Sequence, residues 1–127
     1  MSYDYDEENI FAKILRREIP NDTVMETDYT LAFRDIAPAA PEHILVIPKG
    51  YYVNYDHFAQ EATDAEILDF SRVIGAIAHA IGATPGNGGE GYRLISNAGR
   101  NGVQDVPHLH VHILAGRPLG RMIQAAN

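Results

Sequence analysis

The stretch His108–Leu114 reads HLHVHIL and alternates histidine with aliphatic residues. Side chains of a β-strand point to opposite faces in turn, so the pattern predicts a strand with all three imidazoles on one exposed face. The alternate residues Leu109, Val111 and Ile113 are then expected to enter the core. On a helix the same histidines would scatter around the axis. Three of the chain's 6 histidines fall in this stretch, which makes an accidental arrangement of surface histidines a poor explanation.

Upstream of this stretch, hydrophobic periodicity and capping residues predict the remaining elements. Asn9 is expected to cap a short helix over residues 10–17. Thr63 and Glu66 form a capping-box pattern at the start of a helix over 63–81, which Gly82 is expected to end. Further strands are expected over 23–27, 30–34, 43–47 and 92–96. So few crossovers predict an α+β domain, in which an antiparallel sheet carries two helices on one side.

Length and composition limit what the chain can be. Its 127 residues, 46% of them apolar, fit one domain over 9–118, with a flexible acidic segment at 1–8 and a tail at 119–127. The chain has no cysteine, so it offers no disulfide and no thiolate metal site. A net charge of −7 argues against nucleic-acid binding. An acidic start and the lack of an apolar run of membrane-spanning length predict a cytoplasmic protein that does not bind membranes.

Two glycine-containing segments carry different predictions. The segment 86–91 reads GNGGEG and fits the dinucleotide pattern G-x-G-x-x-G, but a helix precedes it and a strand follows it. That order is the reverse of the one that places a phosphate at a helix N-terminus, so we expect an ordinary loop. The segment 97–105, NAGRNGVQD, leads directly into the histidines. Its glycines let backbone amides approach an anion, which makes it a candidate phosphate loop, with a plain turn as the alternative.

The three aligned imidazoles are compatible with two kinds of chemistry. Zinc could recruit His108, His110 and His43, since two histidines two apart on a strand can share an ion. The full triad fits one ion poorly, because His108 and His112 start roughly 13 Å apart on a strand. The other possibility is nucleophilic catalysis, in which a neutral imidazole attacks phosphorus. Clustered histidines suppress one another's protonation, which favours a neutral nucleophile flanked by donors to phosphate oxygens.

At this point the sequence resembles a known family, the histidine-triad (HIT) proteins, whose signature is His-x-His-x-His followed by apolar residues. The resemblance extends over most of the chain. Within the family, the chain is similar to bacterial members of the purine nucleoside phosphoramidase (Hint) branch. The supporting matches are IFAKI at 10–14, EIP at 18–20, AFRDI at 32–36, APEH at 40–43, VIPK at 46–49 and GRPLG at 116–120.

The resemblance implies a fold and a set of catalytic roles. Each subunit would contribute five antiparallel strands to a ten-stranded sheet in a homodimer. His110 would be the nucleophile, His112 would contact the α-phosphate, and His108 and His43 would orient and buffer the nucleophile. No metal or other cofactor would be needed. The substrate would be a purine nucleotide conjugate.

The resemblance also implies a nucleotide-binding site. Asp35 would accept the ribose hydroxyls, and an apolar slot would hold the purine. The slot would be built from Ile36, Ile10, Phe11 and Ile14, and the phosphate would be held by Asn97, Gly102, Val103, Gln104 and Asp105 together with His110 and His112. Two positions differ from the family pattern. Asp105 stands where many relatives have serine or threonine, and Tyr51 stands where relatives often have histidine.

The reaction implied is cleavage of purine nucleoside phosphoramidates, or of acyl- or aminoacyl-adenylates, through a nucleotidyl-histidine intermediate that water then resolves to AMP or GMP. Two alternatives stay open at this level. A nucleotide-sensing or partner-binding module would use the same pocket with incidental turnover. A zinc-dependent hydrolase would lose its activity to a chelator.

Overall fold

The structure, a computed structural model, describes residues 3–124 and contains one antiparallel five-stranded sheet in the order β1-β2-β3-β5-β4. All four strand pairings are antiparallel, as the sequence predicts. The elements in chain order are α1 (Ile10–Leu15), β1 (Thr23–Glu26), β2 (Thr30–Arg34), β3 (Glu42–Pro48), α2 (Tyr55–Glu61), α3 (Asp64–Ala80), a 3₁₀ turn (Pro85–Asn87), β4 (Tyr92–Ile95) and β5 (Val111–Ala115).

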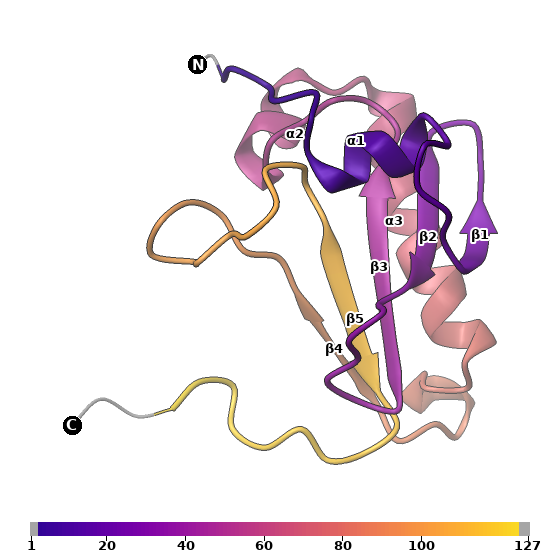
Figure 1. Ribbon diagram of the computed structural model, residues 1–127. Coiled ribbons are helices and arrows are strands. Elements are labelled where there is room, and N and C mark those ends of the chain that lie inside the picture. Colours follow the sequence, from indigo (N-terminus) through magenta and orange to yellow (C-terminus); the bar gives the residue numbers. More distant parts are fainter. Residues whose placement is uncertain (1–2, 125–127) are drawn as a thin grey trace.

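The helices lie on both faces of the sheet, so the expectation of helices on one side is wrong. On one face, α3 packs Phe70, Val73 and Ile77 against Ile44 and Val46 of β3. On the other face, α1 packs against the residues of opposite parity, and Figure 1 shows α1 and α3 on opposite sides of β3. This second cluster consists of Phe11, Ile14, Leu31, Phe33, Leu45 and Ile47. The strands at the centre of the sheet are therefore buried from both sides.

The capping residues begin the helices where the sequence predicts. The Asn9 side chain accepts a hydrogen bond from the amide of Ala12 at the start of α1. The capping box of Thr63 and Glu66 is complete at the start of α3, and Gly82, with φ of 73°, follows its end. Such caps satisfy amides that have no partner inside the helix. The prediction of two helices missed α2, a seven-residue helix.

The stretch Asp64–Asn87 is, by length and composition alone, apolar enough to cross a membrane. The expectation that no stretch reaches that length is therefore wrong by this measure. Such a stretch is also what the core helix of a globular domain provides, and α3 packs its apolar side on the sheet. It exposes Arg72 and His79 on other sides, as a helix that packs one face on a sheet does.

The strand predicted over His108–Leu114 begins only at Val111. The backbone before it bends away: the amide of His108 donates to the carbonyl of Val106, and that of Leu109 donates to Tyr52. The predicted alternation of side chains nevertheless holds, because Leu109, Val111 and Ile113 all enter the core beneath α3. The histidines therefore share the opposite face, which is the face that α1 partly covers.

The two chain ends are held differently. Residues 3–8 run along the domain next to α2, where the Tyr3 hydroxyl donates to Asp56 at 2.5 Å. The tail beyond residue 118 leaves the sheet, and Arg93 donates to the carbonyls of Gly120 and Arg121. The predicted bounds of segments 1–8 and 119–127 stay predictions, and residues 1–2 and 125–127 lie outside the described part of the chain.

Candidate active site

His110 is oriented by the main chain of its own segment. Its Nδ1 lies 2.8 Å from the carbonyl oxygen of His108. A carbonyl only accepts, so Nδ1 carries the hydrogen and, in the neutral ring, Nε2 holds a free lone pair. Nε2 lies 3.7 Å from the carboxylate of Asp105, whose side chain is 82% exposed. Phe11 packs edge-on against the ring, with centroids 4.9 Å apart. The ring is only 3% exposed, so the open face that the sequence predicts is wrong for this residue.

His108 is enclosed, and both of its ring nitrogens are engaged. Nε2 donates to the carbonyl of Pro48 at 2.9 Å, and Nδ1 lies 2.5 Å from the Tyr5 hydroxyl. Its exposed fraction is 0%. Burial first, and then the nearby His110, lower the pKa of His108 from 6.5 to about 4. His108 is therefore neutral at pH 7, and it has no nitrogen left to offer a ligand or a metal ion.

His43 and His112 form a directed chain of hydrogen bonds. The amide of Ala39 donates to Nδ1 of His43 at 3.0 Å, so the hydrogen of the neutral ring sits on Nε2. That Nε2 lies 2.9 Å from Nδ1 of His112, which must accept. Nε2 of His112 is then left as a donor. Burial, followed by repulsion from His110 and His43, lowers the pKa of His112 to about 4.

A cavity of about 310 Å³ lies between α1 and the loop after β2, and no histidine is among the residues that line it. Its lining residues Phe11 and Asp105 approach the ring of His110, and Asp35 approaches His43. The cavity brings together Ile10, Phe11, Ile14, Asp35, Ile36 and Asp105, all singled out from the sequence. Ile36 is 98% exposed, so it forms the rim. The lining residues that the sequence interpretation missed include Phe33, Leu45 and Val106. The alternation of the strand over 30–34 was the signal that could have placed Phe33 on this face.

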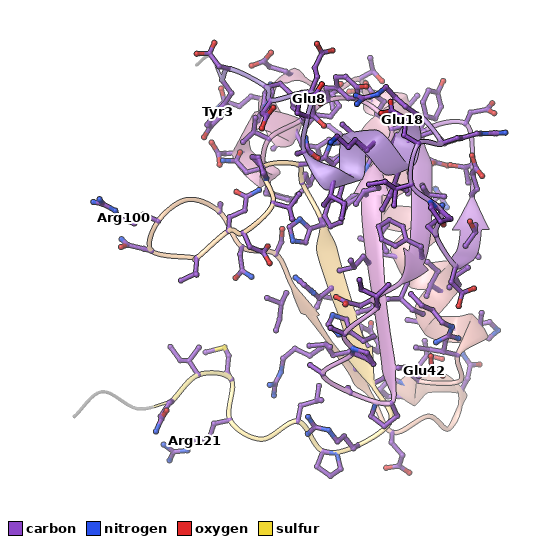
Figure 2. All side chains as sticks on the ribbon, in the orientation of Figure 1. Tyr3, Glu8, Glu18, Glu42, Arg100 and Arg121 are labelled. Carbon is purple, nitrogen blue, oxygen red and sulfur yellow. The ribbon has the colours of Figure 1, made fainter. Side chains whose placement is uncertain are left out.

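The predicted phosphate-binding residues of the loop over 97–105 do not all lie at the cavity. Only Asp105 of this set borders the cavity, whereas Asn97, Gly102, Val103 and Gln104 do not line it. The Gln104 side chain donates to the carbonyls of Val53 and Val106, and so anchors the end of the loop. Gly102 is needed for packing, because a Cβ there would lie 2.6 Å from the carbonyl oxygen of Ala98. At the tip of the loop Arg100 projects away from the domain (Figure 2).

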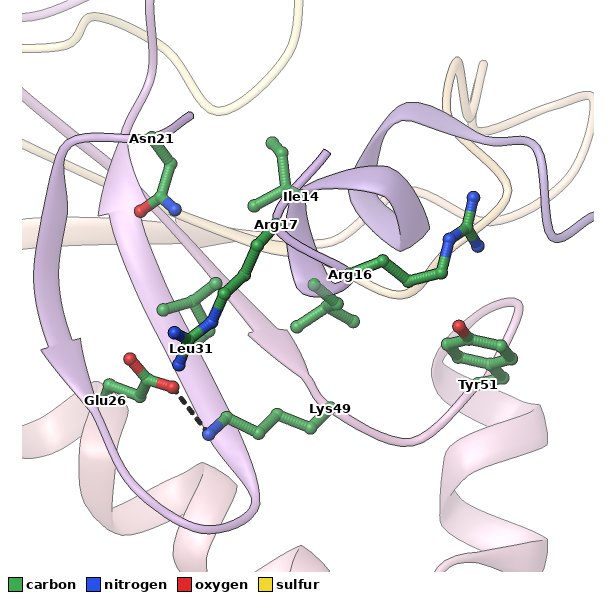
Figure 3. Close-up of a pocket in the computed structure, with 9 residues that line it drawn as sticks. Ile14, Arg16, Arg17, Asn21, Glu26, Leu31, Lys49 and Tyr51 are labelled. Atoms are coloured by element: carbon green, nitrogen blue, oxygen red, sulfur yellow. Dashed lines mark hydrogen bonds and ion pairs between the residues drawn. The ribbon is translucent and has the colours of Figure 1, made fainter. Parts of the chain in front are cut away.

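A second cavity, also bordered by Ile14, is lined by three positively charged side chains (Figure 3). Its cations are Arg16, Arg17 and Lys49. Lys49 donates to Glu26 at 2.7 Å, and Arg16 contacts Glu18 and the carbonyl of Glu7. Two of the three cations therefore already have anionic partners within the protein.

Three side chains near the triad have the composition of a metal site. One ligand atom from each of Asp35, His43 and His112 lies within 4.8 Å of the others. The nitrogens of His43 and His112 that face the centre of this group are joined by the 2.9 Å hydrogen bond, which an ion would have to break. The zinc set suggested by the sequence, His108 with His110 and His43, does not assemble, because both His108 nitrogens are engaged elsewhere.

Comparison with known proteins identifies the family. A family profile described as the HIT domain matches residues 16–119, which include every strand and all the histidines of the site. The chain belongs to the HIT family. The match begins at Arg16, directly after α1, spans most of the chain and confirms the resemblance that the histidine pattern indicated.

Several HIT relatives are similar over nearly their whole length. An uncharacterised HIT-like protein of Azospirillum brasilense is 53% identical over 123 residues, covering 97% of this chain and 98% of that protein. The purine nucleoside phosphoramidase of Escherichia coli K12 is 46% identical over 117 residues, covering 92% and 94% of the two chains. The structure of a histidine triad protein from Clostridium difficile superposes with a TM-score of 0.78 at 40% identity, covering 93% and 98%.

Proposed function

We propose that this HIT protein hydrolyses purine nucleoside phosphoramidates, and related acyl- or aminoacyl-adenylates, through a nucleotidyl intermediate on His110. The observation that carries the proposal is the hydrogen bond from Nδ1 of His110 to the carbonyl of His108. It leaves Nε2 as the free nucleophilic nitrogen, and Phe11 and Asp105, which lie near this ring, line the cavity proposed for the nucleoside. The similarity to the Escherichia coli phosphoramidase supports the same substrate class.

In the first step, Nε2 of His110 forms a bond to the α-phosphorus and the phosphorus–nitrogen bond of the substrate breaks. The electron pair of that bond stays with the departing amine, which takes up a proton. In the second step, water attacks phosphorus, the bond to Nε2 breaks, and AMP or GMP leaves. Neither step needs a metal ion or another cofactor. Turnover is therefore expected to be unaffected by a chelator, unlike that of a zinc-dependent hydrolase.

We assign to His112 the stabilisation of the phosphate during both steps. The chain from Ala39 through His43 leaves Nε2 of His112 as a donor, and a neutral donor costs less to keep half-buried than an imidazolium. A donor aimed at a nonbridging phosphate oxygen strengthens as charge builds up in the transition state. His43 thus acts through His112, and its second neighbour is Asp35, whose carboxylate lies 3.4 Å from Nε2.

The cavity supplies complementary groups for the nucleoside. The Asp35 carboxylate accepts hydrogen bonds and borders the cavity, so it suits the two ribose hydroxyls. The purine would lie between Ile10, Phe11 and Ile36, whose side chains give it apolar contact. Ile10 and Ile36 are the exposed members of this set, and burial by a bound purine would remove their apolar surface from water.

The Asp105 side chain must move away from Nε2 of His110 before the substrate phosphate can approach that nitrogen. Its carboxylate faces Nε2 of His110 from 3.7 Å, and it would repel the α-phosphate in that position. The side chain is 82% exposed on a loop with no regular secondary structure, so it can rotate away. We propose that the amides of residues 102–105 then approach the phosphate, and that Asp105 in its protonated form, or through water, serves the leaving amine.

We further propose that the protein is a homodimer joined through β4. This edge strand pairs only with β5 and exposes Tyr92 and Leu94, whereas the other edge, β1, exposes Thr23 and Glu26. The helix α3 packs over β1, β2 and β3 and on the buried side chains of β5, whereas it lies away from β4 (Figure 1). A second copy pairing at β4 would continue the sheet to ten strands and cover these side chains.

Light scattering tests the proposed dimer. Wild type should have the mass of a dimer, and Leu94→Lys should lower that mass. A wild-type monomer would refute this arrangement.

The decisive experiment is mass spectrometry after brief mixing with an adenosine phosphoramidate. We expect a covalent AMP adduct that maps to His110 and decays as AMP appears. His110→Asn should form no adduct and retain essentially no turnover. His79→Asn is the matched control, because His79 is an exposed histidine on α3 far from the cavity residues. An adduct on another residue, or full turnover by His110→Asn, would refute the proposal and favour a nucleotide-binding module with incidental turnover.

A further inference from the structure

Tyr5 lies before the first helix, yet its side chain is built into the histidine cluster. Its ring stacks on that of Tyr51, with centroids 4.4 Å apart and 9° between the planes. Its hydroxyl lies 2.5 Å from Nδ1 of His108, across 103 positions of sequence. Tyr5 is not among the residues that line the nucleoside cavity. The residue is therefore a neighbour of the triad without being part of the binding site.

The direction of the Tyr5 hydrogen bond follows from the other side of the imidazole ring. Nε2 of His108 faces the carbonyl of Pro48, which only accepts, so Nε2 carries the hydrogen. In the neutral ring Nδ1 is then a bare acceptor, and Tyr5 must donate to it. His108 is 0% exposed, so no solvent can replace this donor without rearrangement. The two partners together fix both the tautomer and the orientation of the ring.

His108 in turn fixes the nucleophile. The carbonyl of His108 accepts the hydrogen bond from Nδ1 of His110, and this bond is what leaves Nε2 of His110 free. A shift of the His108 ring would move the backbone between the two residues and loosen that contact. We propose that Tyr5 is a positioning residue for catalysis, which holds the His110 nucleophile in its reactive orientation by locking His108 through a donated hydrogen bond. This inference rests on the proposed role of His110.

Tyr3 provides a matched control on the same segment. Its hydroxyl is also hydrogen-bonded, donating to Asp56 and accepting from Asn54 at 3.0 Å, and its ring lies against that of His57. All three partners belong to α2 or its cap, so none touches His108. If residues 3–8 act only as packing, Tyr3→Phe and Tyr5→Phe should have similar effects. If Tyr5 acts through His108, only Tyr5→Phe should change the catalytic histidines.

The first measurement is ¹⁵N NMR of the imidazole nitrogens at pH 7, which requires no turnover. Wild type should show His108 as a single tautomer with hydrogen on Nε2. Tyr5→Phe keeps the stacked ring and removes only the hydroxyl, so it should perturb the His108 Nδ1 signal and populate a second state. Tyr3→Phe should leave the His108 signals as in wild type. An unchanged His108 spectrum in Tyr5→Phe would overturn the inference.

The second measurement is the single-turnover rate of AMP transfer to His110. In Tyr5→Phe we expect it to fall between about threefold and tenfold, the range that corresponds to one neutral hydrogen bond. KM should not change, because Tyr5 does not contact the cavity, so the loss appears in kcat. In a His108→Asn background, adding Tyr5→Phe should cost less than it does alone, because the two residues act as one unit.

The outcomes separate this inference from the proposed function. If wild type forms the His110 adduct and Tyr5→Phe forms it at the same rate, Tyr5 is structural only and the hydrolase proposal stands. If wild type forms no adduct, the hydrolase proposal fails and the positioning role fails with it, whatever the NMR shows. Equal losses in Tyr3→Phe and Tyr5→Phe would also overturn the inference, since general packing would then explain both.

Discussion

His108 and His112 each lie two residues from His110 in the sequence, yet their surroundings leave them with different hydrogen-bonding groups to offer a ligand. His108 has both ring nitrogens engaged, by Tyr5 and by Pro48, and is fully buried. His112 has one nitrogen engaged, by His43, and keeps Nε2 as a free donor. Burial lowers the pKa of both to about 4. The shared protonation state therefore does not decide their roles; the number of unengaged nitrogens does.

The strongest test of this difference is removal of the free donor. His112→Ala should lower kcat by about 10²–10³-fold, the usual loss when one donor to a developing oxyanion is removed. His108→Asn should lose less, because the amide can still donate to Pro48 or accept from Tyr5 and never meets the phosphate. Steady-state kinetics of both variants, with His79→Ala as control, make the comparison. A larger kcat loss in His108→Asn would reverse the assignment.

His108, the fully buried histidine of the two, should contribute more than His112 to the pH dependence of the free energy of unfolding. Because burial lowers the pKa of His108 from 6.5 to about 4, the unfolded chain binds more protons than the folded chain between these values. The free energy of unfolding is therefore highest above pH 6.5 and falls as the pH drops toward 4. The full contribution of His108 is on the order of 3 kcal/mol.

Urea unfolding at pH 7 and pH 4.5 measures this effect. His108→Asn cannot titrate, so its free energy of unfolding should fall less between the two pH values than that of wild type. His112→Asn should flatten the dependence less than His108→Asn does, because water reaches the half-buried His112 ring and screens its charge. The carboxylates are common to all three proteins and cancel in the comparison. Equal slopes in wild type and His108→Asn would show that the His108 ring is not held neutral by burial.

Local patterns in the sequence predicted the parts of the fold that local forces determine. Alternation placed Leu109, Val111 and Ile113 in the core, because the two-residue period of an extended chain holds even where the ladder hydrogen bonds of β5 have not yet begun. The capping box of Thr63 and Glu66 located the start of α3 for the same reason, since all of its partners lie within four residues. The short helix α2 was missed because seven residues contain too few turns for a periodic signal.

The sequence could not predict which histidine nitrogens are free, because their partners come from far along the chain. Tyr5 reaches His108 across 103 positions, and His43 reaches His112 across 69. The segment 1–8 was interpreted from its carboxylates, which are exposed, and its tyrosines were overlooked. Family resemblance supplied the identities of the site residues. The structure adds the directions of the hydrogen bonds, which decide what each imidazole can do.

Substitution of His43 should have the smallest effect on kcat, because His43 contacts His112 and not the phosphate. His43→Asn removes the hydrogen bond to Nδ1 of His112 without removing the His112 donor itself. We expect kcat to fall about tenfold, roughly one neutral hydrogen bond, with little change in KM. Asp35→Asn is the matched comparison, because Asp35 also neighbours His43 but borders the cavity, so its loss should raise KM. The ¹⁵N spectrum of His112 should change its tautomer in His43→Asn. If that tautomer is unchanged and kcat is that of wild type, the free donor of His112 does not depend on the chain from Ala39, and the contrast with His108 must be explained by burial alone.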